Sequence, residues 1–575
     1  MNSFASLFYS LFPPQSMALT CVVLAIVATT GMALGSIKVK GISLGIPGVM
    51  FTGLIFGRLI GISRLSLQVI FFIRDFGLIL FVYAVGVQVG PGFVASLRKR
   101  GLPLNLMAAA IILLGAATAV GIAYSTGTDM KAAVGLFAGG TTNAPAFGSA
   151  EEALKSIHPS TMPGTGTPSP GSIEAANITL PAFAIAYPFG LVGVIVAMVV
   201  FRFLFRVNPQ ADADAIAASE KGKASNLATM NIEVANPNLD GLPLRDIPAL
   251  DKSTVVVSRL HHRGAMKIPT PETTIHTGDV LLAVGEPEEV HEFQLILGKP
   301  SAMDLRALPS NITTRQILVT RRDVLGKTVD ELNLPSKLGV AVTRISRAGL
   351  EFTAVGDLAL QFGDRIRAVG ESSALDAAAK LLGDSARELN LPRLLPIFVG
   401  ILFGVTLGCI PILPTSITNL PAPVKLGLAS GPMLVAIILS RIGRVGPLIW
   451  YMPQSASGLL RELGIVLFLI AVGINGGDGF FNKLATPEGF YWLAYGAIIT
   501  LLPLLLVGLF ARIFLKTHYL HICGLLCGSM TSPSLAFTHT MTTSEAPAVA
   551  FATVYPLSMI MRVLVAQLMV LIFVK

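Results

Sequence analysis

The amino-acid sequence predicts a polytopic α-helical membrane protein: two inverted repeats of about five transmembrane helices plus a re-entrant hairpin each, separated by two small α+β domains. Three observations support this fold class. Of the 575 residues, 53% are hydrophobic and only 13% are charged, about half the charged share of an average soluble domain. Long apolar runs recur in both halves of the chain, and the charged residues are concentrated between residues 208 and 390.

The apolar runs are the first elements to justify. They cover residues 17–34, 104–124, 178–205 and 546–574. Each approaches or exceeds the roughly 20 residues that cross a bilayer as a helix. The first run lacks the basic region and cleavage site of a signal peptide, so we expect it to be retained. All four cysteines lie in apolar segments, and neither a disulfide framework nor a metal site is predicted.

The two membrane halves repeat each other. The segment RDFGLILFVYAVGVQVGPGF from Arg74 aligns without a gap with RELGIVLFLIAVGINGGDGF from Arg461. Further along, GLFAGGTTNAPAF from Gly135 parallels GLLCGSMTSPSLAF from Gly524. A duplication therefore predicts the same order of helices in both halves.

The distribution of basic residues predicts the orientation. Lys38 and Lys40 follow the first helix and Arg98–Arg100 follow the third, which places both loops in the cytoplasm. The last helix of this half ends at Arg206 and enters the charged middle region, which is then cytoplasmic. This parity requires the segment around residues 131–149 to enter and return on one side. Five crossings per half make the second half upside down, a plan found in many secondary transporters.

The two GGTTNAPAF-like segments are predicted to be the tips of re-entrant hairpins. Irregular backbone at membrane depth is tolerated only where it is buried in protein or lines a wet cavity. Their polar side chains are candidates for binding a solute, with a purely structural cap as the alternative. These candidates are Thr141, Thr142, Asn143, Thr531, Ser532 and Ser534.

Two further pairs occupy equivalent positions in the halves. Gln88 and Asn475 precede glycines near the ends of their helices, and are either substrate contacts or interhelical hydrogen-bonding groups. Tyr187 and Tyr555 each precede a proline within the last helix of their half. There a packing kink is the alternative to a contact with substrate.

Arg562 breaks the internal symmetry. It lies seven residues after Tyr555 on nearly the same helix face, and its counterpart in the first half is Val194. An arginine in an apolar helix needs a partner, and its planar fork fits a carboxylate. We expect it to bind a substrate carboxylate. A structural ion pair or snorkelling to the membrane interface is the alternative.

Adjacent opposite charges occur inside both long repeats, as Arg74–Asp75 and Arg461–Glu462. Neighbouring residues on a helix point about 100° apart, so each charge is expected to pair with another helix and not within the dipeptide. A structural or gating role is favoured over substrate contact, and Asp75 or Glu462 could carry a coupling proton.

The middle region also repeats itself. LDGLPLRDI from Leu239 matches VLGKTVDEL from Val324, with a constant offset of 85 residues (326 − 241 and 363 − 278). Each copy alternates strand-like segments with a helical tail, a small α+β pattern. No dinucleotide-binding G-x-G-x-x-G follows a strand. The run His261–Arg263 is interpreted as a solvated loop in a strand turn.

These paired segments and hairpins resemble the bacterial aspartate:alanine exchanger family, and the middle copies resemble the C-terminal lobes of potassium-conductance regulators. The resemblance covers nearly the whole chain, except for residues 149–176, which are interpreted as an exposed loop. It implies membrane repeats at 1–206 and 391–575, and cytoplasmic lobes at 207–302 and 303–390. It also implies a multi-pass protein of the bacterial inner membrane that is homodimeric and has a small regulatory ligand.

The predicted function is secondary transport. The resemblance implies exchange or export of small carboxylates, such as aspartate and alanine, by alternating access of an elevator-like kind. A dicarboxylate (succinate-like) exporter is the alternative within the class, and a ligand-gated ion channel is the alternative from another class. The sequence lacks the T-V-G-Y-G filter of potassium channels. It also lacks the metal and nucleophile motifs of enzymes, so no catalytic residue, cofactor or nucleic-acid partner is predicted.

Overall fold

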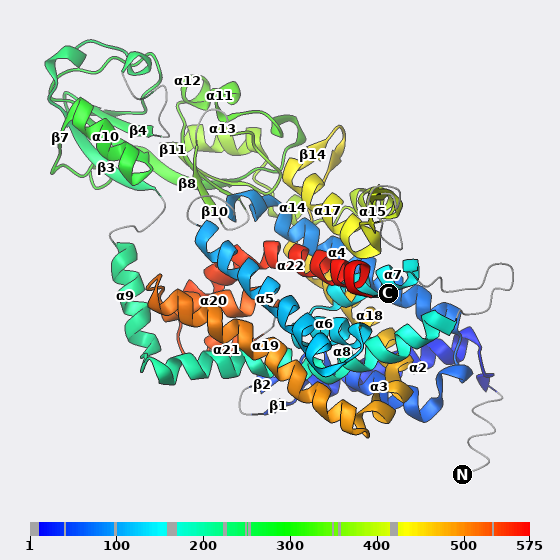
Figure 1. Ribbon diagram of the computed structural model, residues 1–575. Coiled ribbons are helices and arrows are strands. Elements are labelled where there is room, and N and C mark those ends of the chain that lie inside the picture. Colours follow the sequence, from blue (N-terminus) through cyan, green and yellow to red (C-terminus); the bar gives the residue numbers. More distant parts are fainter. Residues whose placement is uncertain are drawn as a thin grey trace. The chain divides into compact units, whose positions relative to one another are not determined.

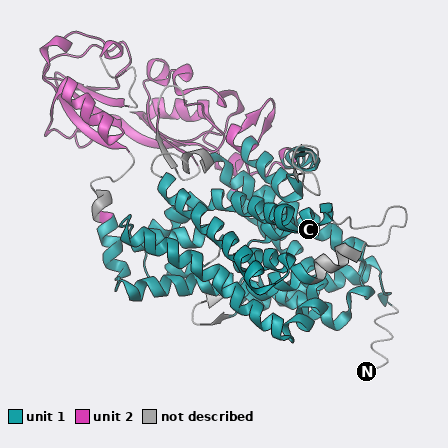
Figure 2. Cartoon of the chain, in the orientation of Figure 1, with its two compact units in different colours: residues 1–216, 397–438, 454–575 teal, residues 217–396, 439–453 magenta. Residues whose placement is uncertain are grey.

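Helices dominate this computed structural model, in which long apolar helices surround shorter broken ones (Figure 1). The structure describes residues 11–39, 42–96, 101–157, 170–221, 227–247, 250, 255–347, 350–354, 358–413, 424–531 and 534–574. The chain divides into two compact units (Figure 2). Unit 1 comprises residues 1–216, 397–438 and 454–575, and unit 2 comprises residues 217–396 and 439–453.

The first half of unit 1 contains one short hairpin and a series of helices. They are β1 (Lys38–Val39), β2 (Ile42–Ser43), α2 (Met17–Ser36), α3 (Gly48–Ile60), α4 (Leu67–Ser96), α5 (Leu102–Thr126), α6 (Met130–Gly140), α7 (Ala144–Ile157), α8 (Pro170–Leu204) and α9 (Pro209–Lys221). A one-turn 3-10 helix, Ile62–Arg64, precedes α4.

The second half repeats this order. It contains α15 (Leu394–Cys409), β12 (Pro411–Leu413), β13 (Val424–Lys425), α17 (Gly427–Ile442), α18 (Gln454–Leu484), α19 (Pro487–Ile513), α20 (Tyr519–Ser529), α21 (Leu535–Thr538) and α22 (Ala546–Phe573). Helices α4 to α8 thus correspond one by one to α18 to α22. The hairpin β1–β2 likewise corresponds to β12–β13.

Eight helices among the described residues are long and apolar enough to cross a membrane. They are α2, α4, α5 and α8 in the first half, and in the second half the 24-residue segment Ala386–Cys409, which includes α14 (Ala386–Asn390) and α15, together with α18, α19 and α22. The two remaining candidates for a fifth crossing, α3 and α17, have only 13 and 16 residues. Both fall short of the roughly 20 residues that a helix needs to span the hydrocarbon core. The chain is therefore a polytopic membrane protein with a central α+β region.

A two-fold axis relates the halves where α4 meets α18. A Cβ atom on Gly77 would lie 2.7 Å from the carbonyl oxygen of Gly464, and a Cβ on Gly464 would lie 2.7 Å from that of Gly77. Reciprocal contact between equivalent residues is the signature of a two-fold axis. Ser457, which precedes Gly464, donates a hydrogen bond to the carbonyl of Ala84, which follows Gly77 (3.3 Å). The two helices are therefore antiparallel, as inverted repeats require.

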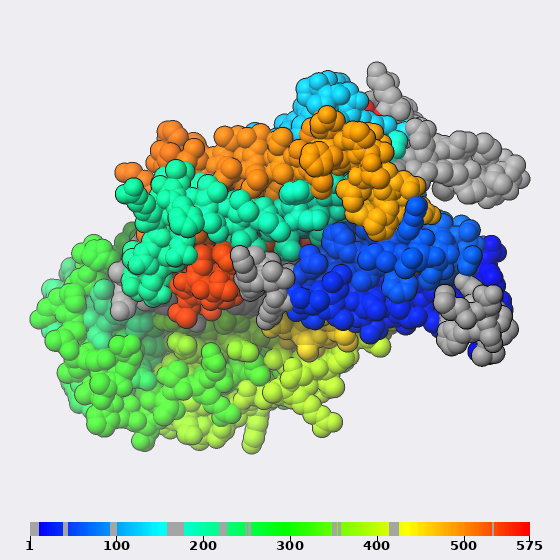
Figure 3. Space-filling view, turned by 90° about the horizontal axis from the view of Figure 1, so that it is seen from below, coloured from blue at the N-terminus to red at the C-terminus, as the bar shows by residue number. Residues whose placement is uncertain are grey.

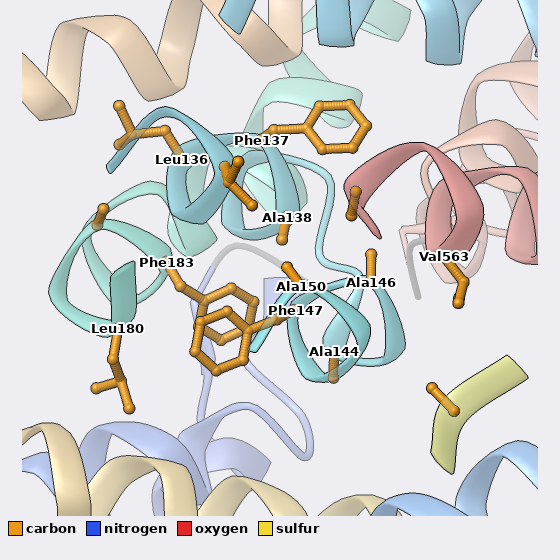
Figure 4. Packing of buried hydrophobic residues seen from close by; sticks show 14 of the residues in the cluster. Leu136, Phe137, Ala138, Ala144, Ala146, Phe147, Ala150, Leu180, Phe183 and Val563 are labelled. Carbon is orange, nitrogen blue, oxygen red and sulfur yellow. The ribbon is translucent and has the colours of Figure 1, made fainter. Parts of the chain in front are cut away.

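The core of unit 1 is built around the broken helices. Helix α6 packs on α8, and α20 packs in the same way on α22. The rings of Phe147 and Phe183 stack with centroids 4.4 Å apart, and Phe137 lies nearby on α6 (Figure 4). On the face seen in Figure 3, α8 and α19 lie side by side along most of their length. Each broken helix is therefore enclosed by long helices of both halves.

Unit 2 contains two similar antiparallel lobes. The first has strand order β5-β4-β6-β3-β7, and the second has the matching order β10-β9-β11-β8. The first lobe consists of β3 (Ala228–Val234), β4 (Val256–His262), β5 (Ala265–Lys267), β6 (Val280–Gly285), α10 (Pro287–Leu297) and β7 (Gly298–Pro300), with 3-10 turns at Pro237–Leu239 and Leu244–Asp246. The second lobe consists of β8 (Ile312–Leu318), a 3-10 turn at Arg322–Val324, α11 (Val329–Leu332), α12 (Leu334–Leu338), β9 (Ala341–Arg347), β10 (Leu350–Thr353), β11 (Arg365–Glu371), α13 (Ser372–Leu382) and α14 (Ala386–Asn390).

The connection between α17 and α18 belongs to unit 2. It forms a two-strand hairpin, β14 (Arg444–Val445) with β15 (Leu448–Ile449). Arg444 donates from Nη1 to the carbonyl of Arg322 at 2.7 Å, and Gln361 donates from Nε2 to the carbonyl of Arg441 at 2.7 Å. The sequence-based domain limits placed this segment in the C-terminal membrane half, whereas residues 439–453 pack with the second lobe.

Candidate functional site

The breaks in the two short helix pairs meet each other. Thr142, between α6 and α7, donates its hydroxyl hydrogen to the carbonyl of Met530 at 2.9 Å. Asn143 donates from Nδ2 to the hydroxyl oxygen of Thr531 at 3.1 Å. Side chains more than 380 positions apart in the chain therefore join the tips of the two repeats directly.

The backbone leaves the helical path at the same position in both tips. Thr142 and Thr531 each have φ of 51°, the left-handed region that β-branched residues rarely adopt. The helix restarts after Asn143, whose side-chain oxygen accepts the backbone N–H of Ala146 at 2.8 Å. Asn at such a position satisfies a free helix N–H, which is why an amide occurs at the break. Backbone strain that is matched in both copies is typical of functional positions.

Arg562 lies against both tips, although it belongs to α22. Its guanidinium donates from Nε to the carbonyl of Ser529 at 2.7 Å and contacts the sulfur of Met530 at 3.2 Å. Its central carbon lies 5.8 Å from the ring centroid of Phe137 on α6. The side chain is 0% exposed, and Nη1 has no hydrogen-bond partner among the described residues. The guanidinium thus retains an unused donor next to both hairpin tips.

The other predicted hairpin residues that the structure describes form hydrogen bonds that do not join the two tips. Thr141 is buried and donates back to the carbonyl of Phe137 at 2.8 Å, within its own helix. Ser534 is buried and donates to the carbonyl of Leu191 on α8 at 3.0 Å. Ser532 lies outside the described residues. Thr142, Asn143 and Thr531 are thus the predicted side chains that join the tips.

The other residues predicted to contact substrate are two tyrosines, which pack against aromatic rings, and two amide residues, which are exposed or partly exposed. Tyr187 packs edge-on against Phe183, with ring centroids 5.3 Å apart, and Tyr555 stacks on Phe551 at 5.1 Å. Gln88 on α4 is exposed and Asn475 on α18 is partly exposed. Neither amide forms a side-chain hydrogen bond with the part of the chain that the structure describes. The aromatic contacts agree with a packing role for both tyrosines.

A second polar cluster lies between α4 and α7. Arg74 pairs from Nη1 with Glu151 at 3.2 Å, and both side chains are about nine-tenths buried. Glu152 accepts the backbone N–H of Leu428 in the first turn of α17 at 2.5 Å. Lys155 lines the same small cavity, whose volume is about 20 Å³. Such a volume holds one water molecule but not an organic substrate, so the cluster suits a structural, gating or proton-relay role.

One sequence-based expectation about this cluster was wrong. Arg74 does pair with a residue of another helix, Glu151, but it also pairs with its neighbour Asp75 (Nε to Oδ1, 2.9 Å). The arginine side chain is long and flexible enough to fold back over the short aspartate, despite the roughly 100° between their Cα–Cβ directions. The equivalent Arg461 and Glu462 form no ion pair with other described residues. The two dipeptides therefore differ in their surroundings.

Sequence reasoning missed Glu151, Glu152 and Lys155. They follow the first hairpin in the run SAEEALK, which was grouped with an exposed loop. The structure instead makes this run part of α7, with Glu151 8% exposed. The available signal was the amphipathic spacing of alanine and leucine beside the acidic residues, which indicates a helix with one packed face.

Comparison with known proteins agrees with this architecture. A family model described as Predicted Permease Membrane Region, of the aspartate–alanine exchanger type, matches residues 23–203 and 396–571. The chain belongs to this permease family. The two matched segments coincide with the two halves of unit 1, so the duplicated membrane part of the permease carries the family likeness. Family membership indicates a membrane transporter.

The two lobes of the permease also match a known domain. A model of the TrkA-C domain matches it at residues 230–298 and again at residues 316–383. A solved structure entitled "Crystal Structure of the GsuK RCK domain" is similar over 28% of the permease and 64% of that chain, with 9% identity and a TM-score of 0.15. The lobes are assigned on the TrkA-C match. The permease therefore combines a duplicated membrane part with a central regulatory region.

Proposed function

We propose that the permease is a secondary active transporter that exchanges or exports small carboxylates, including amino acids such as aspartate and alanine. The observation that supports this proposal is Arg562, a fully buried guanidinium beside both hairpin tips, one of whose donors has no partner among the described residues. The transported solute would cross by alternating access of an elevator-like kind. A dicarboxylate such as succinate is the alternative cargo.

The chemistry of Arg562 favours an anionic solute. A buried charge without a counter-ion is destabilising by several kcal/mol. Among the described residues Arg562 contacts a carbonyl, a sulfur and an aromatic ring, none of which carries a full negative charge. A carboxylate accepts two parallel hydrogen bonds from a guanidinium and neutralises it. Binding of a carboxylate would therefore satisfy Nη1 and remove the electrostatic penalty.

The hydrogen bonds between the tips suggest how access could alternate. Asn143 is 0% exposed and Thr141 is 1% exposed, so a solute reaches the tips only if the two hairpins separate. The contacts between them are few and polar, Thr142 with Met530 and Asn143 with Thr531. A solute carboxylate and amine can replace such hydrogen bonds group for group. We propose that the tips separate for loading and close again over the solute.

Isotope counterflow in liposomes tests the transport class. Purified permease is reconstituted with unlabelled aspartate, alanine or succinate inside, and the labelled compound is added outside. An exchanger accumulates label transiently only when its own substrate is present inside. A channel instead carries current without any internal substrate, and that result would replace the proposal.

Variants of Arg562 test the site itself. Arg562→Gln removes the charge, and Arg562→Lys keeps the charge without the planar fork. Loss of one charged hydrogen-bonding pair weakens binding of a carboxylate roughly 10- to 100-fold. Thr553→Ala is the matched control, because within the part of the chain that the structure describes its hydroxyl bonds only inside α22, to the carbonyl of Val549. Unchanged carboxylate affinity in folded Arg562→Gln protein would contradict this role.

We further propose that the cluster of Arg74, Asp75 and Glu151 controls gating or carries the coupling proton. Arg74 holds acidic partners on its own helix and on α7, the helix that follows the first hairpin tip. Protonation of Glu151 would weaken the ion pair that links α4 and α7, whereas protonation of Asp75 would leave Glu151 as the charged partner of Arg74. For Arg461 and Glu462, at the equivalent positions in the second half, we propose a gating or coupling role that does not rest on such a cluster, because neither forms an ion pair with other described residues.

The family likeness and the central lobes support three broader proposals. The permease would reside in a bacterial inner membrane with both lobes in the cytoplasm, as its basic loops predict. It would act as a homodimer, and a small ligand on the TrkA-C lobes would regulate transport. Crosslinking in native membranes tests the dimer, and protease access to the lobes in inside-out vesicles tests the orientation.

A further inference from the structure

Three potential metal ligands gather at one corner of the first lobe. The ligating atoms of His262, His276 and Asp279 all lie within 4.8 Å of one another. His262 Nδ1 lies 2.6 Å from Asp279 Oδ1, and His276 Nδ1 lies 4.0 Å from Asp279 Oδ2. Asp279 is 4% exposed, whereas both histidines are partly exposed. A buried carboxylate thus faces two imidazoles at the lobe surface.

The sheet fixes the relative positions of these residues. His262 ends β4 and Asp279 immediately precedes β6, and the neighbouring pair His261–Val280 is in direct register. The backbone N–H of His276 donates to Asp279 Oδ2 at 2.9 Å, which holds the carboxylate in place. Strand pairing and a hydrogen-bonded turn therefore hold the three residues of the cluster in position.

The second lobe has different side chains at the positions equivalent to this cluster. At the same offset of 85 residues, Arg347, Gln361 and Asp364 replace His262, His276 and Asp279. Asp364 accepts the backbone N–H of Gln361 at 2.8 Å, as Asp279 does from His276. Arg347 then forms two bonds of 2.7 Å with Asp364. In this lobe a built-in cation neutralises the buried carboxylate.

The first lobe lacks that built-in cation and has an unused ligand instead. His276 Nδ1 is buried and has no hydrogen-bond partner among the described residues. We propose that the first lobe binds a divalent transition-metal ion, such as Zn²⁺, through His262, His276 and Asp279. The metal ion takes the place that the guanidinium of Arg347 occupies in the second lobe.

The geometry requires only small adjustments. Zn²⁺ binds histidine nitrogen at about 2.0–2.1 Å in a tetrahedral arrangement, which separates ligand atoms by roughly 3.3 Å. The distance from His262 Nδ1 to Asp279 Oδ1 must therefore lengthen and that from His276 Nδ1 to Asp279 Oδ2 must shorten, each by less than about 1 Å. The ligating nitrogens of the two histidines, which lie at most 4.8 Å apart, must approach each other by up to about 1.5 Å, within reach of side-chain rotation. With three protein ligands, a water molecule would complete the coordination. The partial exposure of His276 provides access for the ion.

The second lobe also supplies the test variants. His262→Arg and His276→Gln, made together in the full-length permease, give the first lobe the residues found in the second lobe. The double variant is expected to fold, because the guanidinium introduced at position 262 would pair with Asp279 as that of Arg347 does with Asp364.

The measurement is metal binding by permease purified without a polyhistidine tag. Zn²⁺ content is measured after dialysis, Co²⁺ is followed by its visible absorption, and the unfolding temperature is recorded with and without Zn²⁺. We expect the wild type to bind one more ion per chain than the double variant, with the absorption of tetrahedral Co²⁺. We also expect Zn²⁺ to raise the unfolding temperature of the wild type only.

His291→Gln is the matched control, because His291 is an exposed histidine of the same lobe on α10. Equal Zn²⁺ content in wild type and double variant would overturn the proposal. It would also be overturned if acidification but not Zn²⁺ stabilised the wild type, since the cluster would then bind protons. Both results are independent of the transported solute, so they leave the proposed transport function untouched.

Discussion

The amide of Asn143 donates a hydrogen bond to the hydroxyl of Thr531, and this 3.1 Å contact joins the broken helices of the two repeats. The same amide also lies 3.4 Å from the sulfur of Met559 on α22. Asn143 is 0% exposed, so an unsatisfied amide there costs about 1–3 kcal/mol. The junction of the hairpins therefore rests on this hydroxyl of the second repeat and on the hydrogen bond from Thr142 to the carbonyl of Met530.

Substitution of Thr531 tests this junction. Thr531→Val keeps the shape of the side chain but removes the hydroxyl, whereas Thr531→Ser keeps the hydroxyl. We expect Thr531→Val to lower both the unfolding temperature and the initial counterflow rate. Thr531→Ser should keep both values close to those of the wild type. Serine also relieves the strain of a β-branched residue at φ of 51°. Identical behaviour of the two variants would show that the hydroxyl is unimportant.

Glycine substitutions in α18 test the contact on the two-fold axis. Gly464→Ala would bring a Cβ within 2.7 Å of the carbonyl of Gly77, whereas Gly458 has nothing within 4 Å of the equivalent position. Overpacking of this kind costs about 1–3 kcal/mol. We therefore expect Gly464→Ala to lower the unfolding temperature in detergent and Gly458→Ala to leave it unchanged or raise it. Equal effects would mean that α4 and α18 do not pack this closely.

Removal of Arg74 is expected to destabilise the permease strongly. Glu151 and Asp75 would lose their shared cation, and a buried pair that loses one partner costs about 3–5 kcal/mol. Arg58→Gln is the control, because the Arg58–Asp478 pair of similar length (3.0 Å) is about half exposed and worth about 0–1 kcal/mol. Thermal unfolding measures this difference: the loss of Arg74 should lower the unfolding temperature much more than Arg58→Gln does.

The double variant Arg74→Gln, Glu151→Gln separates structure from coupling. It removes the ion pair without leaving a buried charge unpaired between α4 and α7, so part of the stability should return. If the cluster carries the coupling proton, transport by this folded variant should lose its dependence on a pH gradient. Transport that keeps the wild-type pH dependence would assign the cluster a structural role only.

Substitution of Arg444 tests the connection between α17 and α18. Arg444→Ala removes hydrogen bonds to the carbonyls of Arg322 and Leu325 in the second lobe. We expect hydrogen exchange of the amides of β14 and β15 to rise by roughly an order of magnitude, the effect of losing about 1.4 kcal/mol. Arg321→Ala, which removes an exposed pair with Asp323, is the control. Unchanged exchange would show that other contacts hold this hairpin.

Much of the fold was predictable because the duplicated halves still align with each other in sequence. The alignment of the segments from Arg74 and Arg461 identified α4 and α18, which cross on the two-fold axis. The left-handed residues Thr142 and Thr531 lie in the two segments that were predicted to be hairpin tips. The lobes were predictable for the same reason, as two copies at a constant offset.

The partners of the charged residues were less predictable. Arg74 and Glu151 are 77 positions apart (151 − 74), and no local pattern links them. His276 joins His262 only because a turn returns the chain to the end of β4. Side-chain clusters of this kind depend on tertiary geometry.

The position of the axis also limits how the two copies could diverge after duplication. Gly77 and Gly464 touch each other, so a larger side chain in either copy would be felt by both, and neither glycine was free to change alone. Val194 and Arg562 occupy equivalent places away from that contact, and there one copy carries a charge that the other lacks. Unequal chemistry in the two copies is therefore easier to accommodate at a position such as Arg562 than at Gly77 or Gly464, where equivalent backbones meet.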